Sequence, residues 1–253
     1  MHDRGRRVIE VEDLAVTYGD VTALSGVDLR VEAGRFVTLV GPSGCGKTSL
    51  LRAVGGLEPP ASGRVRVAGE PPERAQERGD VGFVFQRHAL LPWKSALSNV
   101  TFLREMAGEP ADREGARDLL DRMGLAGREG ARPAELSGGM AQRVAIARAL
   151  HLDAAVLLMD EPFGELDELT REETGIEVSQ VWREHEKTVL FVTHSVPEAV
   201  LLGDRCVVMR GSPGRVEASV EVDLPRPRDE AVLESDTFYE HVAAVRRALR
   251  GEA

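Results

Sequence analysis

One stretch, residues 41–48 (GPSGCGKT), limits what this chain can fold into more than any other part of the sequence. Its pattern is G-x-x-x-x-G-K-[ST], and it stands between an apolar run, Phe36–Val40, and a helix-like run that begins at Thr48. A strand, a glycine-rich loop and a helix in this order form a phosphate-binding loop, because the glycines let backbone N–H groups turn toward a phosphate chain and the helix directs its positive end to the same place. The alternative is a glycine-rich turn that binds nothing, but such a turn would meet these constraints only by accident. The stretch therefore predicts a site for a nucleoside triphosphate.

Within this loop, two side chains have expected roles of their own. Lys47 is expected to reach the β- and γ-phosphates, and the Thr48 hydroxyl to bind Mg²⁺. The loop residues that we expect to contact the nucleotide are Gly41, Pro42, Ser43, Gly44, Cys45, Gly46, Lys47 and Thr48.

Composition is that of an ordinary globular protein and argues against a surface for nucleic acid. The net charge is −10, whereas a surface that holds nucleic acid needs clustered excess Lys and Arg. Two cysteines, Cys45 and Cys206, are too few for a disulfide framework, which favours a reducing compartment. The chain has no apolar run of the length that a signal peptide or a membrane span needs. We therefore expect any function at a membrane to depend on a partner.

Strand-like patterns lie on both sides of the phosphate-binding loop. Residues 8–16 and 27–31 alternate apolar and polar side chains, which predicts two half-exposed antiparallel strands before the loop. Tyr18 follows the first of them, and an aromatic ring there either stacks on an adenine or simply packs. Further strands are expected at 65–67, 81–85, 154–161, 188–193 and 207–209, with a turn at 70–80.

Polar side chains follow three of the buried strands. Asp160 and Glu161 end one strand, and because neighbouring side chains in a strand point to opposite faces, the two carboxylates have different roles. Asp160 is placed to hold Mg²⁺ through water, as a Walker B aspartate does, and Glu161 to polarise an attacking water. His194 either donates to a γ-phosphate or caps its strand, and Gln86 either touches a metal and water or is a surface residue.

The pattern from residue 95 to residue 152 turns helical, which predicts a helical subdomain inserted into the strand-rich core. Its last helix opens at residues 136–140 (LSGGM), where Ser137 is a plausible N-cap and two glycines leave the first helical N–H groups bare. This helix start is either a second anion-binding site or an ordinary capped helix. The charged tail, residues 229–253, is expected to form a peripheral helix.

Taken together, these stretches resemble the ATP-binding-cassette ATPases. The stretches that carry the resemblance are residues 41–48, Gln86, 136–140, 156–161, Asp167 and His194. Leu-Ser-Gly-Gly just ahead of the Walker B strand is that family's own signature, and the order and spacing match from about residue 8 to residue 222. The resemblance implies an α/β fold, with a RecA-like P-loop NTPase core, an antiparallel β subdomain that carries Tyr18 and an inserted α-helical subdomain.

The resemblance also implies domain limits. The ATPase domain would span residues 1–228, with its core in 1–87 and 153–222 and the helical subdomain in 88–152. The tail, residues 229–253, would follow as a helical appendage.

The resemblance further implies a homodimer in which each ATP lies between the phosphate loop of one chain and the Ser137, Gly138 and Gly139 of the other. The two anion-binding helix starts would then serve two different nucleotides. In this arrangement Glu161 is the general base, His194 contacts the γ-phosphate and Asp167 communicates across the dimer. Thr48 and Asp160 hold Mg²⁺, and Gln86 links metal and water to a transport partner.

Among the cassettes, the chain is similar to the importer ATPases for nitrate, sulfonate and taurine. Their counterparts here are residues 90–93 (LLPW), 162–170 (PFGELDELT), 188–195 (TVLFVTHS) and 225–228 (PRPR). Two residues depart from the usual pattern: Ala141 stands where Gln is usual and Glu165 where Ala is usual. We expect position 141 to lie near the surface facing the partner's nucleotide, where the change would alter signalling.

The function that the resemblance implies is a Mg²⁺-dependent ATPase that drives import of a small solute. The chain would lie peripherally on the cytoplasmic face of the cell membrane, bound to an integral membrane permease and, through it, to an extracytoplasmic solute-binding protein. No nucleic acid is expected as a partner.

A non-transport cassette ATPase of DNA repair, chromosomes or the ribosome is the alternative. The DNA-associated chains usually carry coiled-coil or zinc insertions between the two Walker motifs, and this chain has neither heptads nor cysteine pairs there. A ribosome-associated protein would normally hold two cassettes in one chain. A P-loop GTPase is disfavoured, since no Asn-Lys-x-Asp motif occurs.

Overall fold

The computed structural model describes residues 7–164, 166–185 and 187–252, and these residues build one mixed sheet covered by helices. The strand order is β4-β1-β2-β9-β8-β3-β7-β6-β5. The strands are β1 (Arg7–Tyr18), β2 (Val21–Glu32), β3 (Phe36–Val40), β4 (Ser62–Val67), β5 (Val81–Val84), β6 (Val156–Asp160), β7 (Thr188–Val192), β8 (Arg205–Gly211) and β9 (Gly214–Glu221). The expected α/β class is therefore confirmed.

The parallel half of the sheet, β8-β3-β7-β6-β5, forms the centre of the molecule. Every residue of β3, β6 and β7 is buried, as expected of apolar runs with a layer on each face. The register pairs Leu39 with Val192 and Asp160 with Val192. The carboxyl ends of β3, β6 and β7 therefore meet at one edge of the sheet.

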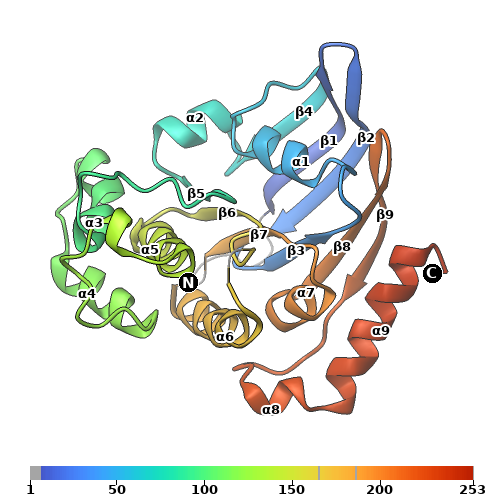
Figure 1. The fold of residues 1–253 in the computed structure, drawn as a ribbon. Coiled ribbons are helices and arrows are strands. Elements are labelled where there is room, and N and C mark those ends of the chain that lie inside the picture. Colours follow the sequence, from blue (N-terminus) through green and yellow to red (C-terminus); the bar gives the residue numbers. More distant parts are fainter. Residues whose placement is uncertain (1–6, 165, 186, 253) are drawn as a thin grey trace.

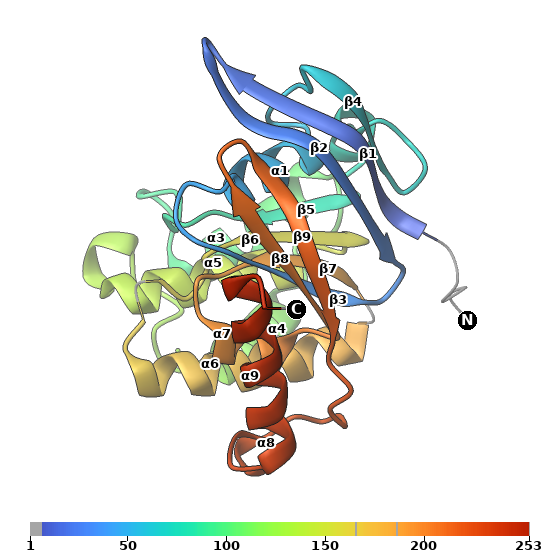
Figure 2. The ribbon, with the colours of Figure 1, turned by 90° about the vertical axis from the view of Figure 1, so that its right-hand side faces the viewer.

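The antiparallel half, β4-β1-β2, lies at the top of the view in Figure 2, with the parallel strands below it. It meets the parallel half where Leu24 of β2 pairs with Gly214 of β9. A Cβ added at Gly214 would lie 1.9 Å from the carbonyl oxygen of Cys45, far closer than any side chain could approach. The turn into β9 therefore packs directly against the backbone of the phosphate loop, which only glycine allows.

Helices cover both faces of the parallel strands (Figure 1). On one face, α1 (Lys47–Val54) shares a core cluster with β1, β2 and alternate residues of β3, β6 and β7. On the other face, α5 (Gly138–His151) and α6 (Glu168–His185) share a cluster with other apolar residues of these strands. α7 (Val196–Leu202) packs with the tail in a third cluster.

The inserted helices gather at one side of the molecule, at the left in Figure 1. They are α3 (Ala96–Met106), α4 (Arg113–Arg122), the short 3-10 turn η1 (Pro133–Glu135) and α5. α3 and α4 both pack on α5, whose buried residues join this group to the core of the sheet.

Two segments differ from the sequence expectations. The expected turn at residues 70–80 contains a helix, α2 (Pro72–Glu77), which begins with a proline in its first turn, a position that proline favours. The tail forms α8 (Glu230–Leu233) and α9 (Asp236–Arg250). α9 is not merely peripheral, because Phe238 and Val245 are buried against α7 and β8. Among the described residues, no helix has the length and apolar character that a membrane crossing requires.

Candidate functional site

The phosphate loop joins β3 to α1 at the edge where the parallel strands end. Gly46 precedes α1 with a φ of 88°, and a Cβ there would come within 2.4 Å of Leu24. Both the backbone conformation and the space therefore require glycine. The Lys47 side chain is 6% exposed, and its Nζ donates to the carbonyls of Gly41 and Pro42 at 2.9 and 3.1 Å. The loop backbone thus folds around its own lysine.

No side chain caps the start of α1. Serine side chains accept a hydrogen bond at the starts of α3, α5, α7 and α9, where the caps are Ser95, Ser137, Ser195 and Ser235. The first N–H groups of a helix have no hydrogen-bond acceptor within the helix, and at α1 no side chain supplies that acceptor. This helix start therefore fits an anionic ligand, and the loop around Lys47 fits a phosphate chain.

Thr48 and Asp160 come together across the edge of the sheet. The Thr48 hydroxyl donates to Oδ1 of Asp160 at 3.0 Å, and Asp160 is 6% exposed. Burial raises the pKa of the Asp160 carboxyl, while the hydrogen bond from Thr48 opposes this rise. Mg²⁺ in nucleotide sites is usually held by one or two protein oxygens together with the phosphates. These two side chains fit that pattern, and their role as metal ligands stays a prediction.

Glu161 has the backbone of a strained position. Its φ is 43°, in the left-handed region that residues with a side chain rarely adopt. Its N–H donates to the carbonyl of Val192 at 3.0 Å, which holds it to the end of β7. Oε2 of Glu161 lies 3.2 Å from Nδ1 of His194. The carboxylate predicted to polarise the attacking water and the imidazole predicted to contact the γ-phosphate therefore face each other, and the His194 side chain is 58% exposed.

Tyr18 and Gln86 lie at the rim of the same edge. The Tyr18 hydroxyl is 3.4 Å from the hydroxyl of Ser49 in α1, and the residue is 40% exposed. An exposed ring beside the phosphate loop is available for stacking. Gln86 is exposed and follows β5 by two residues, and the pairing of Val84 with Met159 puts it beside the end of β6. None of the hydrogen bonds in the described part of the chain joins Gln86 to Thr48 or Asp160.

The stretch Ser137–Gly139 lies at the start of α5 and is separate from the phosphate loop of the same chain. Ser137 Oγ accepts the N–H of Met140 at 3.2 Å, so the predicted N-cap is confirmed. Ser137 and Gly138 are exposed, and no hydrogen bond or ion pair of the described residues joins them to residues 41–48. Asp167 is also exposed, and it accepts the N–H of Thr170, which lowers its pKa.

One expectation is corrected by burial, and another lies outside the described residues. Ala141 is 2% exposed and packs in the core of the helical subdomain, so it does not lie on an exposed surface. Cys45 is 2% exposed and its thiol is shielded from solvent, while contact of this loop residue with a nucleotide stays a prediction. Glu165, the other departure from the family pattern, is not among the described residues.

Sequence reasoning missed two buried polar side chains of α5 that hold the Gln86 segment. Nε2 of Gln142 donates to the carbonyl of Phe85 at 3.3 Å, and Arg148 donates to the carbonyls of His88 and Ala89. Burial lowers the pKa of the Arg148 guanidinium. The sequence signal that could have identified them is a polar residue within an otherwise apolar, buried helix, because such a side chain needs a specific hydrogen-bond partner.

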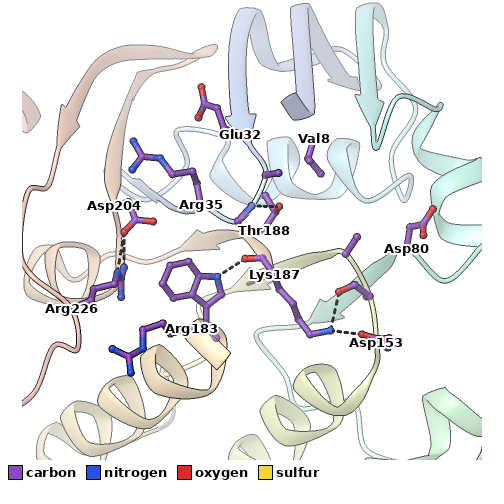
Figure 3. A pocket seen from close by; sticks show the side chains of 15 residues that line it. Val8, Glu32, Arg35, Asp80, Asp153, Arg183, Lys187, Thr188, Asp204 and Arg226 are labelled. Carbon is purple, nitrogen blue, oxygen red and sulfur yellow. Dashed lines mark hydrogen bonds and ion pairs between the residues drawn. The ribbon is translucent and has the colours of Figure 1, made fainter. Parts of the chain in front are cut away.

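A cavity of about 920 Å³ lies at the opposite edge of the sheet, at the amino ends of the parallel strands (Figure 3). Four of its charged groups pair with one another: Arg226 with Asp204 at 2.8 Å, and Lys187 with Asp153 at 3.5 Å. Ligands of open α/β sheets bind at the carboxyl ends of the strands. The cavity is therefore distinct from the phosphate site.

Comparison with known proteins gives a consistent result. A family model described as "ABC transporter" matches residues 24–164. An ABC transporter ATP-binding protein of Methanocaldococcus jannaschii is 44% identical, over 99% of this chain and 94% of the relative. The aliphatic sulfonates import ATP-binding protein SsuB of Pseudomonas entomophila is 46% identical, over 87% of this chain and 78% of the relative.

A second import subunit and a solved structure agree with these matches. The bicarbonate transport ATP-binding protein CmpD of Synechococcus elongatus is 41% identical, over 91% of this chain and 86% of the relative. The dimeric post-hydrolysis structure of the ATP-binding cassette MJ0796, bound to ADP and Pi, has a TM-score of 0.77 and 31% identity. It covers 86% of this chain and 100% of that one.

Proposed function

Because this chain belongs to the ABC transporter family, we propose that it is the ATP-hydrolysing subunit that energises import of a small solute through a separate membrane permease. The chain is an ATPase of the cassette type that uses ATP and Mg²⁺. The observation that carries the proposal is the meeting of four groups at one edge of the sheet. They are an uncapped helix start behind a phosphate loop, the Thr48–Asp160 pair, strained Glu161, and His194.

The chemistry that we propose is in-line attack of water on the γ-phosphorus. Lys47 and the N–H groups that begin α1 bind the phosphates and counter the charge that develops on them. Mg²⁺, held by Thr48 and Asp160 with Gln86 nearby, would neutralise phosphate charge. Glu161 orients the attacking water and takes its proton, and His194 donates to a γ-phosphate oxygen.

We further propose that two copies complete each site. Ser137, Gly138 and Gly139 are exposed or half-exposed and lie at a helix start, so they are free to meet a nucleotide held by another chain. The dimeric structure of the related cassette bound to ADP and Pi supports this arrangement. Asp167, exposed in the turn before α6, would then communicate between the two sites.

The nature of the cargo follows from the relatives. Import subunits for aliphatic sulfonates and bicarbonate are 41–46% identical to this chain, so we propose a small solute that carries an anionic group, of the sulfonate, bicarbonate, nitrate or taurine type. The chain would lie on the cytoplasmic face of the membrane, bound to its permease, which would receive the solute from an extracytoplasmic binding protein. The names of these relatives give no support to the non-transport alternative.

The proposal is tested by comparing Lys47→Ala and Glu161→Gln with the wild-type chain. We expect Lys47→Ala to lose ATP binding, whereas Glu161→Gln should bind Mg·ATP with wild-type affinity and lose turnover by about 10²- to 10⁴-fold, the usual worth of a general base. Equilibrium binding of a fluorescent ATP analogue and phosphate release measure the two properties. Wild-type turnover in Glu161→Gln would refute the assigned base, and unimpaired ATP binding in Lys47→Ala would refute the site.

A further inference from the structure

An ion pair behind the candidate site joins the helices that follow two of its residues. Nε of Arg171 in α6 lies 3.2 Å from Oε1 of Glu198 in α7, and the two side chains are 27% and 11% exposed. α6 begins directly after Asp167, and α7 begins two residues after His194. The pair therefore connects the first turns of two helices. Of the residues that precede them, Asp167 is predicted to communicate across the dimer and His194 to contact the γ-phosphate.

The arginine of this pair also binds the turn that carries Asp167. Nη2 of Arg171 donates to the carbonyl of Leu166 at 3.0 Å, and the Arg171 N–H donates to the carbonyl of Asp167 at 2.9 Å. A guanidinium can hold two acceptors at once in a fixed geometry, and here they are the Leu166 carbonyl and the Glu198 carboxylate. The Arg171 side chain therefore fixes the Leu166 carbonyl, whereas the N–H bond to Asp167 is a backbone bond of the helix that does not depend on the side chain.

The carboxylate of the pair binds the strand end that carries His194. Oε2 of Glu198 accepts the Thr193 hydroxyl at 2.5 Å, and Thr193 Oγ1 in turn accepts the N–H of Ser195 at 2.9 Å. These contacts bracket His194 on both sides. Burial raises the pKa of the Glu198 carboxyl, while Thr193 and Arg171 oppose that rise. A largely buried carboxylate depends on its partners, so moving one end of this chain of contacts disturbs the other.

The same two segments are also joined at the front of the site. Glu161 faces His194 at 3.2 Å, and its carbonyl accepts the N–H of Gly164 at 3.1 Å in the turn toward Leu166. The contacts thus form a continuous network that runs from Glu161 through the turn to Arg171 and Glu198 and back to His194. Such a network limits movement of the turn and the strand end relative to each other, whereas the Glu161–His194 contact alone is exposed and weak.

We propose that Arg171 and Glu198 are positioning residues for hydrolysis, which hold the Asp167 turn and the His194 strand end in fixed relation to each other. The inference rests on the proposed function. Neither residue contacts the phosphate loop, so ATP binding by Lys47 and Thr48 does not depend on the pair. Its loss misplaces His194 and Asp167 and slows the step in which the γ-phosphate is transferred to water.

The test compares Arg171→Gln, Glu198→Gln, the double variant and Arg171→Lys, with Glu173→Gln, an exposed carboxylate on the same helix, as the control. We expect kcat to fall about ten- to a hundredfold in both single Gln variants, because a small displacement of the reacting groups causes losses of this size. The KM for ATP should change less than about twofold. The double variant should be no slower than the single ones, because residues that act as one unit are non-additive. Arg171→Lys keeps the charge but reaches only one acceptor, and its kcat should lie between Arg171→Gln and wild type.

Several outcomes would overturn the inference. They are a kcat unchanged in the single variants, losses that multiply in the double variant, or a rise in KM without a fall in kcat. Thermal melts and ATP affinity identify a Gln variant that loses activity because it unfolds. In that case the kcat of Arg171→Lys is compared with that of wild type instead. If wild type and Glu173→Gln do not hydrolyse ATP, the proposed function itself fails; if they do and the pair variants match them, only this inference fails.

Discussion

Replacing Glu161 by glycine separates the contribution of this residue to folding from its contribution to chemistry. At a φ of 43°, a residue with a side chain carries a left-handed strain of about 1–2 kcal/mol. Glycine removes that strain but gives the unfolded chain about 0.4–1 kcal/mol of extra conformational freedom. The interaction of Glu161 with His194, whose side chain is 58% exposed, contributes little to stability. Glu161→Gly should therefore be more stable than Glu161→Gln by about 0.5–1 kcal/mol.

Urea unfolding of the nucleotide-free variants measures this difference, and a thermal melt should show a shift of about 2 °C. Both variants should lose turnover to the same extent, since neither retains the carboxylate. Glu161→Gln is the matched control because it keeps the strained backbone and a polar end near His194. If Glu161→Gly is less stable than Glu161→Gln, then Glu161 stabilises the fold in its present conformation, and the claim that the strain serves function is wrong.

Three further perturbations follow from burial. Arg228 is 1% exposed and donates to three carbonyls at the end of α7 and just beyond it, and burial lowers its pKa to about 10. Arg228→Met should lower the free energy of unfolding by about 2–4 kcal/mol, whereas Arg246→Met, at an exposed position, should not, as urea titration would show. Cys45 is 2% exposed, so a bulky maleimide should label it only after unfolding; rapid labelling of the native chain would contradict its inward orientation. Trp93 is 68% exposed, and tryptophan is enriched where proteins bind one another. Trp93→Ala should therefore weaken co-purification with the proposed permease while basal ATPase stays unchanged; equal recovery of the permease would show that Trp93 does not contribute to that contact.

Local patterns sufficed for the elements whose chemistry is local. The loop at residues 41–48 was predictable because strand, glycines and helix start are contiguous, and the ends of β6 and β7 because apolar runs stop at polar residues. α2 was missed since its six residues are rich in charge and begin at a proline, a composition that also describes a turn.

Long-range contacts could not be predicted in the same way. The Arg171–Glu198 pair joins two helices. In the sequence, however, both residues are equally consistent with charged side chains on solvated helix surfaces. The inward turns of Cys45 and Ala141 depend on how the loop and α5 pack, which one residue's identity does not reveal. The strained φ of Glu161 likewise depends on its backbone bond to β7. Glu161 lies at the site, where function rather than local propensity selects the conformation.

The central claim, that each ATP site is completed by a second copy of the chain, is tested most directly by mixing two inactive variants. Lys47→Ala removes the phosphate lysine, and Ser137→Arg blocks the exposed start of α5, so neither variant alone should hydrolyse ATP. A mixed dimer contains one site built from an intact phosphate loop and an intact Ser137, and random pairing restores up to about a quarter of the sites. We predict that phosphate release in the mixture rises well above the sum of the separate variants. A mixture no more active than that sum, or a fully active Ser137→Arg chain, would contradict the account.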